Sequence, residues 1–151
     1  MEPREQAAAG GLKGGKSGNA ADGGHSALAG RRALVVGGSG GIGAAVARGL
    51  AARGASVLVH GRNPSSVAAV VAAIRRGGGQ AEGLALPLDS AGPLLAAVSQ
   101  AGPFDILVAA FGPFVRKPLA DHSPEDWERM ASLNLALPGA LVSAFFPAMC
   151  D

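Results

Sequence analysis

The chain has 151 residues, of which 48% are hydrophobic and 16% charged, and this length suits one globular unit with a single buried core. The net charge of +2 is small and the basic residues are scattered, which argues against a nucleic-acid-binding surface despite a pI of about 9.2. One cysteine, Cys150, excludes an internal disulfide, and together with the lack of a signal-peptide segment it predicts a cytoplasmic protein.

The first 29 residues differ in composition from the rest of the chain. They are rich in Ala, Gly, Lys and Ser and show no apolar period, so residues 1–29 are predicted to be a disordered tail and residues 30–151 the globular domain. Within the tail, Gly10–Ser17 matches the ATP-binding pattern G-x-x-x-x-G-K-[ST]. No strand pattern precedes this segment and no helix pattern follows it, so we interpret the match as chance.

An apolar run that ends in glycines marks the start of the domain. Arg32–Val36 is predicted to be a buried strand, Gly37–Gly41 a tight turn and Ile42–Arg53 a helix. Three apolar residues of this helix are predicted to share one face: Ile42, Val46 and Leu50. Glycines let a phosphate approach the backbone, and the N–H groups that begin a helix favour an anion, so this segment predicts a nucleotide phosphate site.

Two glycine patterns overlap in this turn. Gly38, Gly40 and Gly43 form G-x-G-x-x-G, while Gly37, Gly41 and Gly43 form G-x-x-x-G-x-G. A glycine-rich turn without such a role is the alternative, but the preceding strand and the following amphipathic pattern favour a dinucleotide site. The residues predicted to contact the dinucleotide here are Gly37, Ser39, Gly40, Gly41, Ile42 and Gly43.

Strand and helix patterns then alternate at short intervals. Strands are predicted at Ala55–His60, Ala81–Leu88 and Phe104–Ala110, and helices at Ser65–Arg76 and Pro93–Gln100, where Asp89 or Ser90 is expected to cap the second helix. This alternation is typical of a parallel sheet in an α/β fold. The residues predicted to form the buried face of the first of these helices are Val67, Val70, Val71 and Ile74.

The last predicted helix has clear start signals. Ser123 is expected at the N-cap, with Pro124 in the first turn and Asp126 three residues after the cap. The helix is predicted to run past Asn134, and its second half is almost wholly apolar but is interrupted by prolines and a glycine. We therefore expect one side to pack on the sheet and the other to meet a partner subunit, without crossing a membrane.

Several ordered segments resemble the short-chain dehydrogenase/reductase family, which carries T-G-x-x-x-G-I-G at the glycine turn, N-N-A-G after the fourth strand and W-x6-N in the following helix. The resemblance implies a Rossmann-type doubly wound parallel sheet with strand order 3-2-1-4, truncated before the family's fifth strand. The segments that carry it, besides the turn, are His60–Asn63, Leu88–Ser90, Leu107–Gly112, and Trp127 with Asn134.

The end of the second strand indicates which dinucleotide the site prefers. A carboxylate there would bind a free ribose 2′-hydroxyl, whereas an arginine suits a 2′-phosphate. The chain has His60, Gly61, Arg62 and Asn63 and no acid, so we predict NADP(H), with Arg62 and Asn63 at the cofactor. The alternative is that Arg62 is a solvated loop residue.

By the resemblance, Asp89 and Ser90 bind the adenine end, and Ala109, Ala110 and Gly112 lie beside the nicotinamide ribose. An Asp before a helix is also a common cap, so a purely structural role for Asp89 stays open. Two departures from the family, Val36 for Thr and Ala109–Phe111 for Asn-Asn-Ala, remove polar groups on neighbouring strands. We expect the fold to survive, because losing both partners of a hydrogen bond can be nearly neutral.

The family transfers hydride between a nicotinamide and a carbonyl or alcohol, using Tyr, Lys, Ser and Asn. The chain contains no tyrosine, and of this set the resemblance finds only Asn134, which has a second interpretation as a polar residue that breaks a helix. The three histidines are dispersed, so we predict no metal site.

We therefore interpret the chain as the NADP-binding half of a reductase or dehydrogenase, closest in general resemblance to 3-oxoacyl-carrier-protein reductases. The parent protein is expected to act on a small carbonyl or alcohol substrate and to be a homo-oligomer, while this chain alone is expected to be inactive. The alternatives are a non-catalytic NADP-binding or interaction protein and, less favoured without an acid after the second strand, another Rossmann enzyme such as a methyltransferase.

Overall fold

The computed structural model describes residues 27–150 of the chain. Most of the tail predicted for residues 1–29, including the ATP-loop match, lies outside this range. At its start, residues 27–30 form a turn, and the Leu28 backbone N–H donates a hydrogen bond to the Arg53 carbonyl, 2.9 Å from nitrogen to oxygen. The division of the chain at residue 30 stays a prediction.

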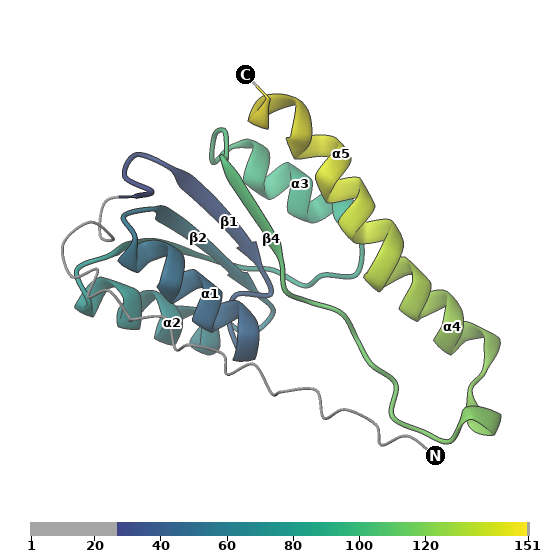
Figure 1. Cartoon of the computed structure of the whole chain (residues 1–151). Helices are drawn as coiled ribbons and strands as arrows, with labels where there is room; N and C mark the ends of the chain where they lie inside the picture. The colour runs from purple at the N-terminus through teal and green to yellow at the C-terminus, as the bar shows by residue number, and fades with distance from the viewer. Residues whose placement is uncertain (1–26, 151) are drawn as a thin grey trace, which may run out of the picture.

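Four parallel strands form the sheet: β1 (Arg32–Val36), β2 (Ser56–Gly61), β3 (Gln80–Ala85) and β4 (Ile106–Ala109). Their order is β3-β2-β1-β4, which confirms the predicted order and the Rossmann-type α/β fold (Figure 1). Because all strands run the same way, the segments that follow them meet at one edge of the sheet, where such folds bind ligands.

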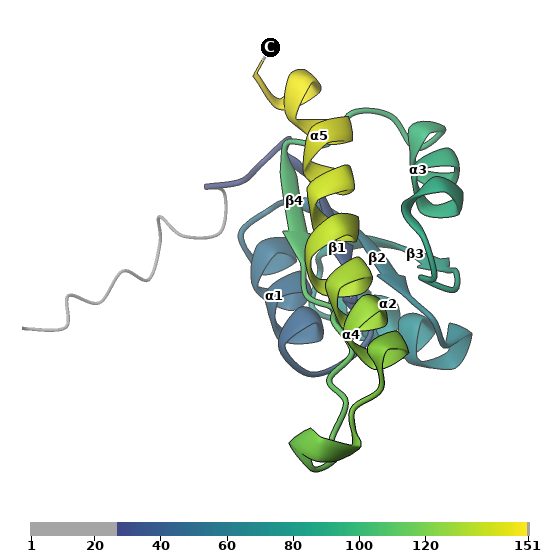
Figure 2. The same ribbon diagram turned by 90° about the vertical axis from the view of Figure 1, so that its right-hand side faces the viewer.

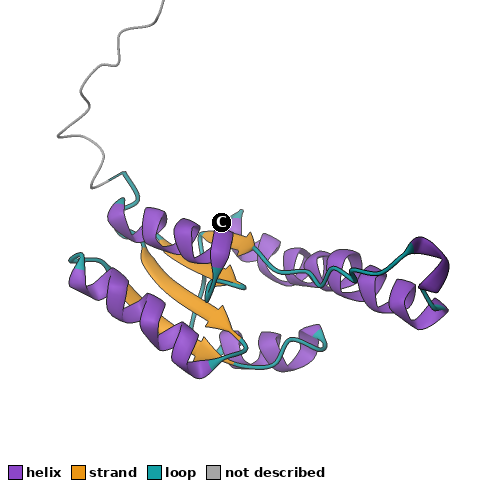
Figure 3. Cartoon of the chain, turned by 90° about the horizontal axis from the view of Figure 1, so that it is seen from below, coloured by secondary structure: helices purple, strands orange, loops and turns teal. Residues whose placement is uncertain are grey.

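Helices cover both faces of this sheet, as Figures 1 and 3 show. The first two helices pack on one face, and the third and last helices pack on the other. The helices are α1 (Gly41–Ala52), α2 (Pro64–Arg76), α3 (Ala91–Ser99), the 3-10 turn η1 (Leu119–Asp121), α4 (Pro124–Ala131), the π-helical turn η2 (Ser132–Ala136) and α5 (Leu137–Met149).

Alternate residues of β1 enter two separate cores. Ala33 and Val35 contact the core under α1 and α2, whereas Leu34 and Val36 contact the core under α3 and α5. All four are fully buried, as expected for a central parallel strand that is covered on both faces. The apolar run in the sequence therefore reflects burial on two sides.

Helix α1 packs through a different face from the predicted one. Ile42 is 80% exposed, and Val46 and Leu50 are only partly buried. Small side chains face the sheet because α1 lies very close to the glycine turn, where a Cβ added at Gly43 would collide with the Gly37 carbonyl. The buried residues of α1 are Gly43, Ala44, Ala47 and Ala51. In α2, by contrast, the predicted buried face is confirmed.

Two predicted strands are shorter in the structure than in the sequence-based prediction. β3 ends at Ala85 rather than Leu88, because Pro87 has no N–H to continue a ladder. β4 begins at Ile106, while Phe104 is buried in the preceding loop. Neither change affects the order of the sheet.

The capping signals of the last predicted helix are confirmed. The Ser123 hydroxyl accepts from the Asp126 backbone N–H, and the Asp126 carboxylate accepts from the Ser123 N–H at 2.8 Å. From Pro124 to Met149 the helical segment is long and apolar enough, by length and composition, to cross a membrane. Its second part, α5, lies beside β4 (Figure 2). Leu137 and Leu141 of α5 are buried in the core on that face of the sheet.

Candidate functional site

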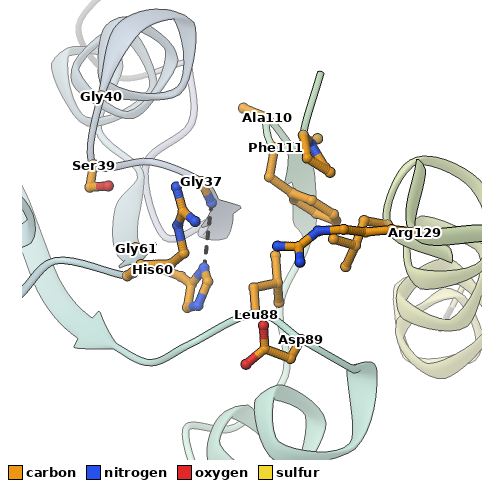
Figure 4. Close-up of a pocket in the computed structure, with 14 residues that line it drawn as sticks. Gly37, Ser39, Gly40, His60, Gly61, Leu88, Asp89, Ala110, Phe111 and Arg129 are labelled. Carbon is orange, nitrogen blue, oxygen red and sulfur yellow. Dashed lines mark hydrogen bonds between the residues drawn. The ribbon is translucent and has the colours of Figure 1, made fainter. Parts of the chain in front are cut away.

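A cavity of about 320 Å³ lies at the edge of the sheet where the strands end. Segments that follow all four strands line it, and α4 and η2 close its far side (Figure 4). Half of the fourteen lining residues come from the predicted site: Gly37, Ser39, Gly40, Arg62, Asp89, Ala110 and Gly112. The other half were not predicted: His60, Gly61, Leu88, Phe111, Pro113, Arg129 and Leu133.

The glycine turn has the backbone shape that its sequence predicted. Gly37 has φ +81°, in the left-handed region, and a Cβ there would collide with the Ala110 carbonyl. Gly43 packs in the same way against Gly37. A side chain at Gly37 would push the turn away from the end of β4, and one at Gly43 would push the start of α1 away from the turn. Both glycines therefore shape the site, although only Gly37 lines the cavity.

The start of α1 leaves backbone donors available at the cavity. Gly40 occupies the N-cap position without a side-chain hydrogen bond, and the first turn carries no acidic residue. The first N–H groups of a helix have no partner within it, and they carry the positive end of the helix dipole. This end of the cavity therefore suits an anionic group such as a pyrophosphate.

His60 is the last but one residue of β2 and is 1% exposed. Among the residues that the structure describes, it is the one buried residue with a polar or charged side chain. Its Nε2 lies 3.0 Å from the Leu86 carbonyl, and its Nδ1 lies 3.4 Å from the Gly37 backbone nitrogen (Figure 4). Its own carbonyl accepts from the Gly38 N–H at 2.8 Å. Burial lowers the pKa of His60, partly offset by the bond to Leu86, so the neutral ring is favoured.

The residues after β2 divide into a cavity residue and a helix cap. Arg62 is exposed and lines the cavity. Asn63 caps α2, because its Oδ1 accepts from the Ser65 N–H at 2.9 Å and from the Ser66 N–H at 3.3 Å. Asn63 lies outside the cavity lining, and its predicted contact with the cofactor stays a prediction.

Gly61 allows the glycine turn to reach the end of β2. A Cβ at Gly61 would collide with the side chain of Ser39, so the two segments touch at this point. Both residues line the cavity. The Ser39 hydroxyl and the Arg62 guanidinium are thus carried on adjoining parts of one rim.

After β3, the two predicted residues also separate. Ser90 occupies the N-cap of α3 but makes no side-chain capping bond, and Asp89 is not the cap. Ser90 thus holds the cap position that the sequence predicted for Asp89 or Ser90, but it does so without a side-chain hydrogen bond. Asp89 is exposed and lines the cavity beside the buried Leu88, where Figure 4 shows its carboxylate.

After β4, Ala110 and Phe111 line the cavity while Ala109 does not. The Ala110 N–H donates to the Val36 carbonyl at 2.8 Å, so the two strands remain tied through their backbones where the family has polar side chains. Phe111 is half-buried and packs against the core under α3 and α5. The departures from the family pattern therefore leave the sheet intact, as expected.

Asn134 lies in the π-helical turn η2 rather than in the cavity lining. Its Nδ2 donates to the Met130 carbonyl at 3.0 Å and to the Pro113 carbonyl at 3.2 Å. Its Oδ1 lies against Gly112, where a Cβ would collide with it. Asn134 thus both interrupts the α-helix and holds the loop after β4, and its catalytic role stays a prediction.

No motif in the sequence pointed to Arg129 and Leu133. Both line the cavity, and because they are four residues apart they share one face of the helical segment formed by α4 and η2. Figure 4 shows Arg129 across the cavity from the glycine turn. With Arg62 and Asp89, Arg129 gives the lining two cations and one anion, which favours a negatively charged ligand. Within residues 27–150, no cluster of His, Cys, Asp and Glu could hold a metal ion.

Sequence and structure comparisons identify relatives of this fold and site. Residues 31–151 match the profile of the short chain dehydrogenase family. A short chain dehydrogenase of Pseudocercospora fijiensis is 37% identical over 131 residues, covering 82% of this chain and 42% of that protein. A 3-oxoacyl (acyl-carrier-protein) reductase of Agrobacterium tumefaciens with NADP bound superposes with TM-score 0.75 and 39% identity, covering 81% of this chain and 48% of the other.

A metagenomic short-chain oxidoreductase in complex with NADP gives TM-score 0.71 and 37% identity, covering 81% of this chain and 57% of the other. The chain thus spans about half the length of the relatives that it matches. The family profile covers most of the described fold, including the glycine turn, the ends of all four strands and Asn134. The chain belongs to the short chain dehydrogenase family.

Proposed function

We propose that the chain supplies the NADP(H) site of an oxidoreductase that transfers hydride to or from a small carbonyl or alcohol substrate. The observation that carries this proposal is the meeting of the α1 N-terminus, Ser39 and Arg62 on one rim of the cavity. Both comparison structures described above hold NADP. The chain's own residues fit that cofactor at three points.

The pyrophosphate fits the glycine turn. Gly37 and Gly43 let the turn, the end of β4 and the start of α1 pack closely together, and the first turn of α1 offers N–H groups without a nearby acid. The 2′-phosphate fits the next part of the rim, where Arg62 provides a cation and Ser39 a hydroxyl. No carboxylate follows β2 to bind a free 2′-hydroxyl, since the strand is followed by Arg62 and Asn63.

The remaining two groups of the cofactor fit the other walls of the cavity. We assign the adenine to the wall formed by Leu88, Asp89 and Arg129, and the nicotinamide ribose to the backbone at Ala110 and Gly112. When bound, NADPH supplies hydride to a carbonyl carbon. The chain's residues then hold the dinucleotide in place, and Asn134 fixes the loop at Gly112 on which that end of the site depends.

Proton transfer to the resulting alkoxide needs an acid that the cavity does not contain. The lining carries no Tyr, Lys or Cys, and His60 is buried against Leu86 and Gly37 beneath the phosphate turn. We therefore propose that the 151-residue chain binds the dinucleotide but does not by itself turn over substrate. A non-catalytic NADP-binding or interaction protein is the second candidate, because the same cavity would bind the dinucleotide in that case too.

Titration of the wild type with NADP⁺ and NAD⁺ tests the assignment of Arg62. A charge-assisted contact to the 2′-phosphate contributes about 1.5–3 kcal/mol, so Arg62→Ala should weaken NADP⁺ binding by about 10–100-fold and leave NAD⁺ binding nearly unchanged. Arg76→Ala is the matched control, because Arg76 is an exposed arginine at the far end of α2. An equal preference for the two nucleotides in the wild type would refute the proposal.

A further inference from the structure

His60 links two walls of the cavity that are distant in sequence. Through Nδ1 it accepts from the Gly37 N–H of the glycine turn, and through Nε2 it reaches the Leu86 carbonyl in the segment that follows β3. Its backbone carbonyl accepts from the next N–H of the turn, that of Gly38. One residue therefore holds two successive N–H groups of the turn and the start of the segment that carries Leu88 and Asp89.

These contacts determine the protonation state and the tautomer of the ring. A carbonyl oxygen can only accept, so Nε2 must carry the proton that binds Leu86. A backbone N–H can only donate, so Nδ1 must keep its lone pair for Gly37. A single neutral tautomer satisfies both contacts. Protonation of Nδ1 would place two donors against each other and break the bond to the turn.

The contacts also divide the N–H groups of the turn between two roles. Gly37 and Gly38 are occupied by His60 beneath the turn, while the groups at the start of α1 remain available to a ligand. The Gly37 bond therefore acts on the ligand only through the shape of the turn. Loss of that bond should loosen the cradle without removing any group that touches the ligand.

We propose that neutral His60 is a positioning residue of the dinucleotide site, which holds the glycine turn and the segment after β3 in the arrangement that binds the cofactor. The inference rests on the NADP(H) site proposed above. The charged groups that face the same cavity are Arg62 from its own strand end, Asp89 from the segment after β3 and Arg129 from α4. The glycine turn itself contributes no titratable side chain.

A pH series of calorimetric titrations with NADP⁺, from about pH 8 downwards, tests this role, since burial lowers the pKa of His60 and moves its change of charge below the ordinary value of 6.5. His60→Asn is the matched variant, because its amide oxygen can accept from Gly37 but cannot be protonated in this range. Titration of the 2′-phosphate and of the neighbouring charges occurs in both proteins and cancels in the comparison. As the pH falls below the pKa of His60, the wild type should lose affinity more steeply than His60→Asn, by up to about tenfold for each further pH unit.

Parallel pH profiles for the two proteins would refute the role of His60. Failure of the wild type to bind NADP⁺ at about pH 8 would instead refute the proposed function itself. A third measurement does not depend on any variant folding, namely ¹⁵N NMR of the imidazole in the unliganded wild type. It should show a protonated Nε2 and an unprotonated Nδ1, and the opposite tautomer would overturn the inference whatever the binding data show.

Discussion

Gly43→Ala should separate the steric demand of the site from ordinary helix propensity. Gly43 lies in the first turn of α1, and a Cβ there would collide with the carbonyl of Gly37 and the Cα of Gly38. These are backbone atoms, so no side chain can rotate away. Gly49→Ala is the matched control in the same helix, because the nearest atom to its added Cβ is the end of the Arg53 side chain at 3.5 Å.

The two substitutions should change stability in opposite directions. Alanine in a helix interior is favoured over glycine by about 0.5–1 kcal/mol, so Gly49→Ala should raise the free energy of unfolding by that amount. At position 43 the same gain is opposed by an overpacking cost of about 1–3 kcal/mol, because α1 must move away from the turn. We expect a net loss of about 0.5–2 kcal/mol for Gly43→Ala and weaker NADP⁺ binding.

Urea denaturation and calorimetric NADP⁺ titration of the two variants provide the assay. The wild type supplies the reference for both the free energy of unfolding and the affinity. Equal stabilisation by Gly43→Ala and Gly49→Ala, with unchanged NADP⁺ affinity, would show that the close packing of α1 on the turn is not required and would refute the reasoning.

Acid stability, a helix cap, the edge of the sheet and turnover can each be tested separately. The Lys117 ammonium and the Ser123 N–H hold the pKa of Asp126 at about 2, below its ordinary value of 3.8, so this carboxylate's contribution to stability should be complete above about pH 4 and lost as the pH falls towards 2. Asp126→Asn should flatten that part of the acid-unfolding curve. Asn63→Ala removes the α2 cap and should cost about 0.5–2 kcal/mol in urea denaturation. β4 lies at the edge of the described sheet, so light scattering should detect self-association of the 151-residue chain, and a monodisperse monomer at high concentration would contradict this. Finally, NADPH oxidation with ketones or 3-oxoacyl thioesters should stay at background for this chain, because a positioned acid usually contributes about 10²–10⁴-fold, and turnover would mean that another group supplies the proton.

The fold was predictable because its main signals are local. β1 and its turn are encoded by an apolar run that ends in glycines, and the start of α4 is encoded by a capping box at Ser123. The face of α1 was not predictable from periodicity. Its apolar residues do share a face, but the need for close approach at Gly43 places alanines against the sheet and leaves Ile42 exposed.

The ionisable side chains of the cavity also differ in how far the sequence alone predicts their roles. Arg62 follows a strand at a spacing that has a known chemical meaning, so it could be singled out from the sequence. His60 stands two residues before it and gave no such signal, because its importance comes from the buried contacts of both ring nitrogens. A histidine at a strand end can be interpreted in this way only once the partners on both sides are known.

The two ends of the cavity therefore differ in how the sequence encodes them. The phosphate end is made largely of backbone, and backbone shape is written into the glycines at positions that require it, such as Gly37 with φ +81°. The opposite wall is made of the side chains of Phe111, Arg129 and Leu133, which are brought together where η2 and α5 pack on the sheet and α4 continues from η2. The backbone contacts beneath these side chains, such as the Ala110 bond to Val36, do not depend on side-chain identity, so substitutions in this wall can change the pocket while the phosphate end keeps its shape.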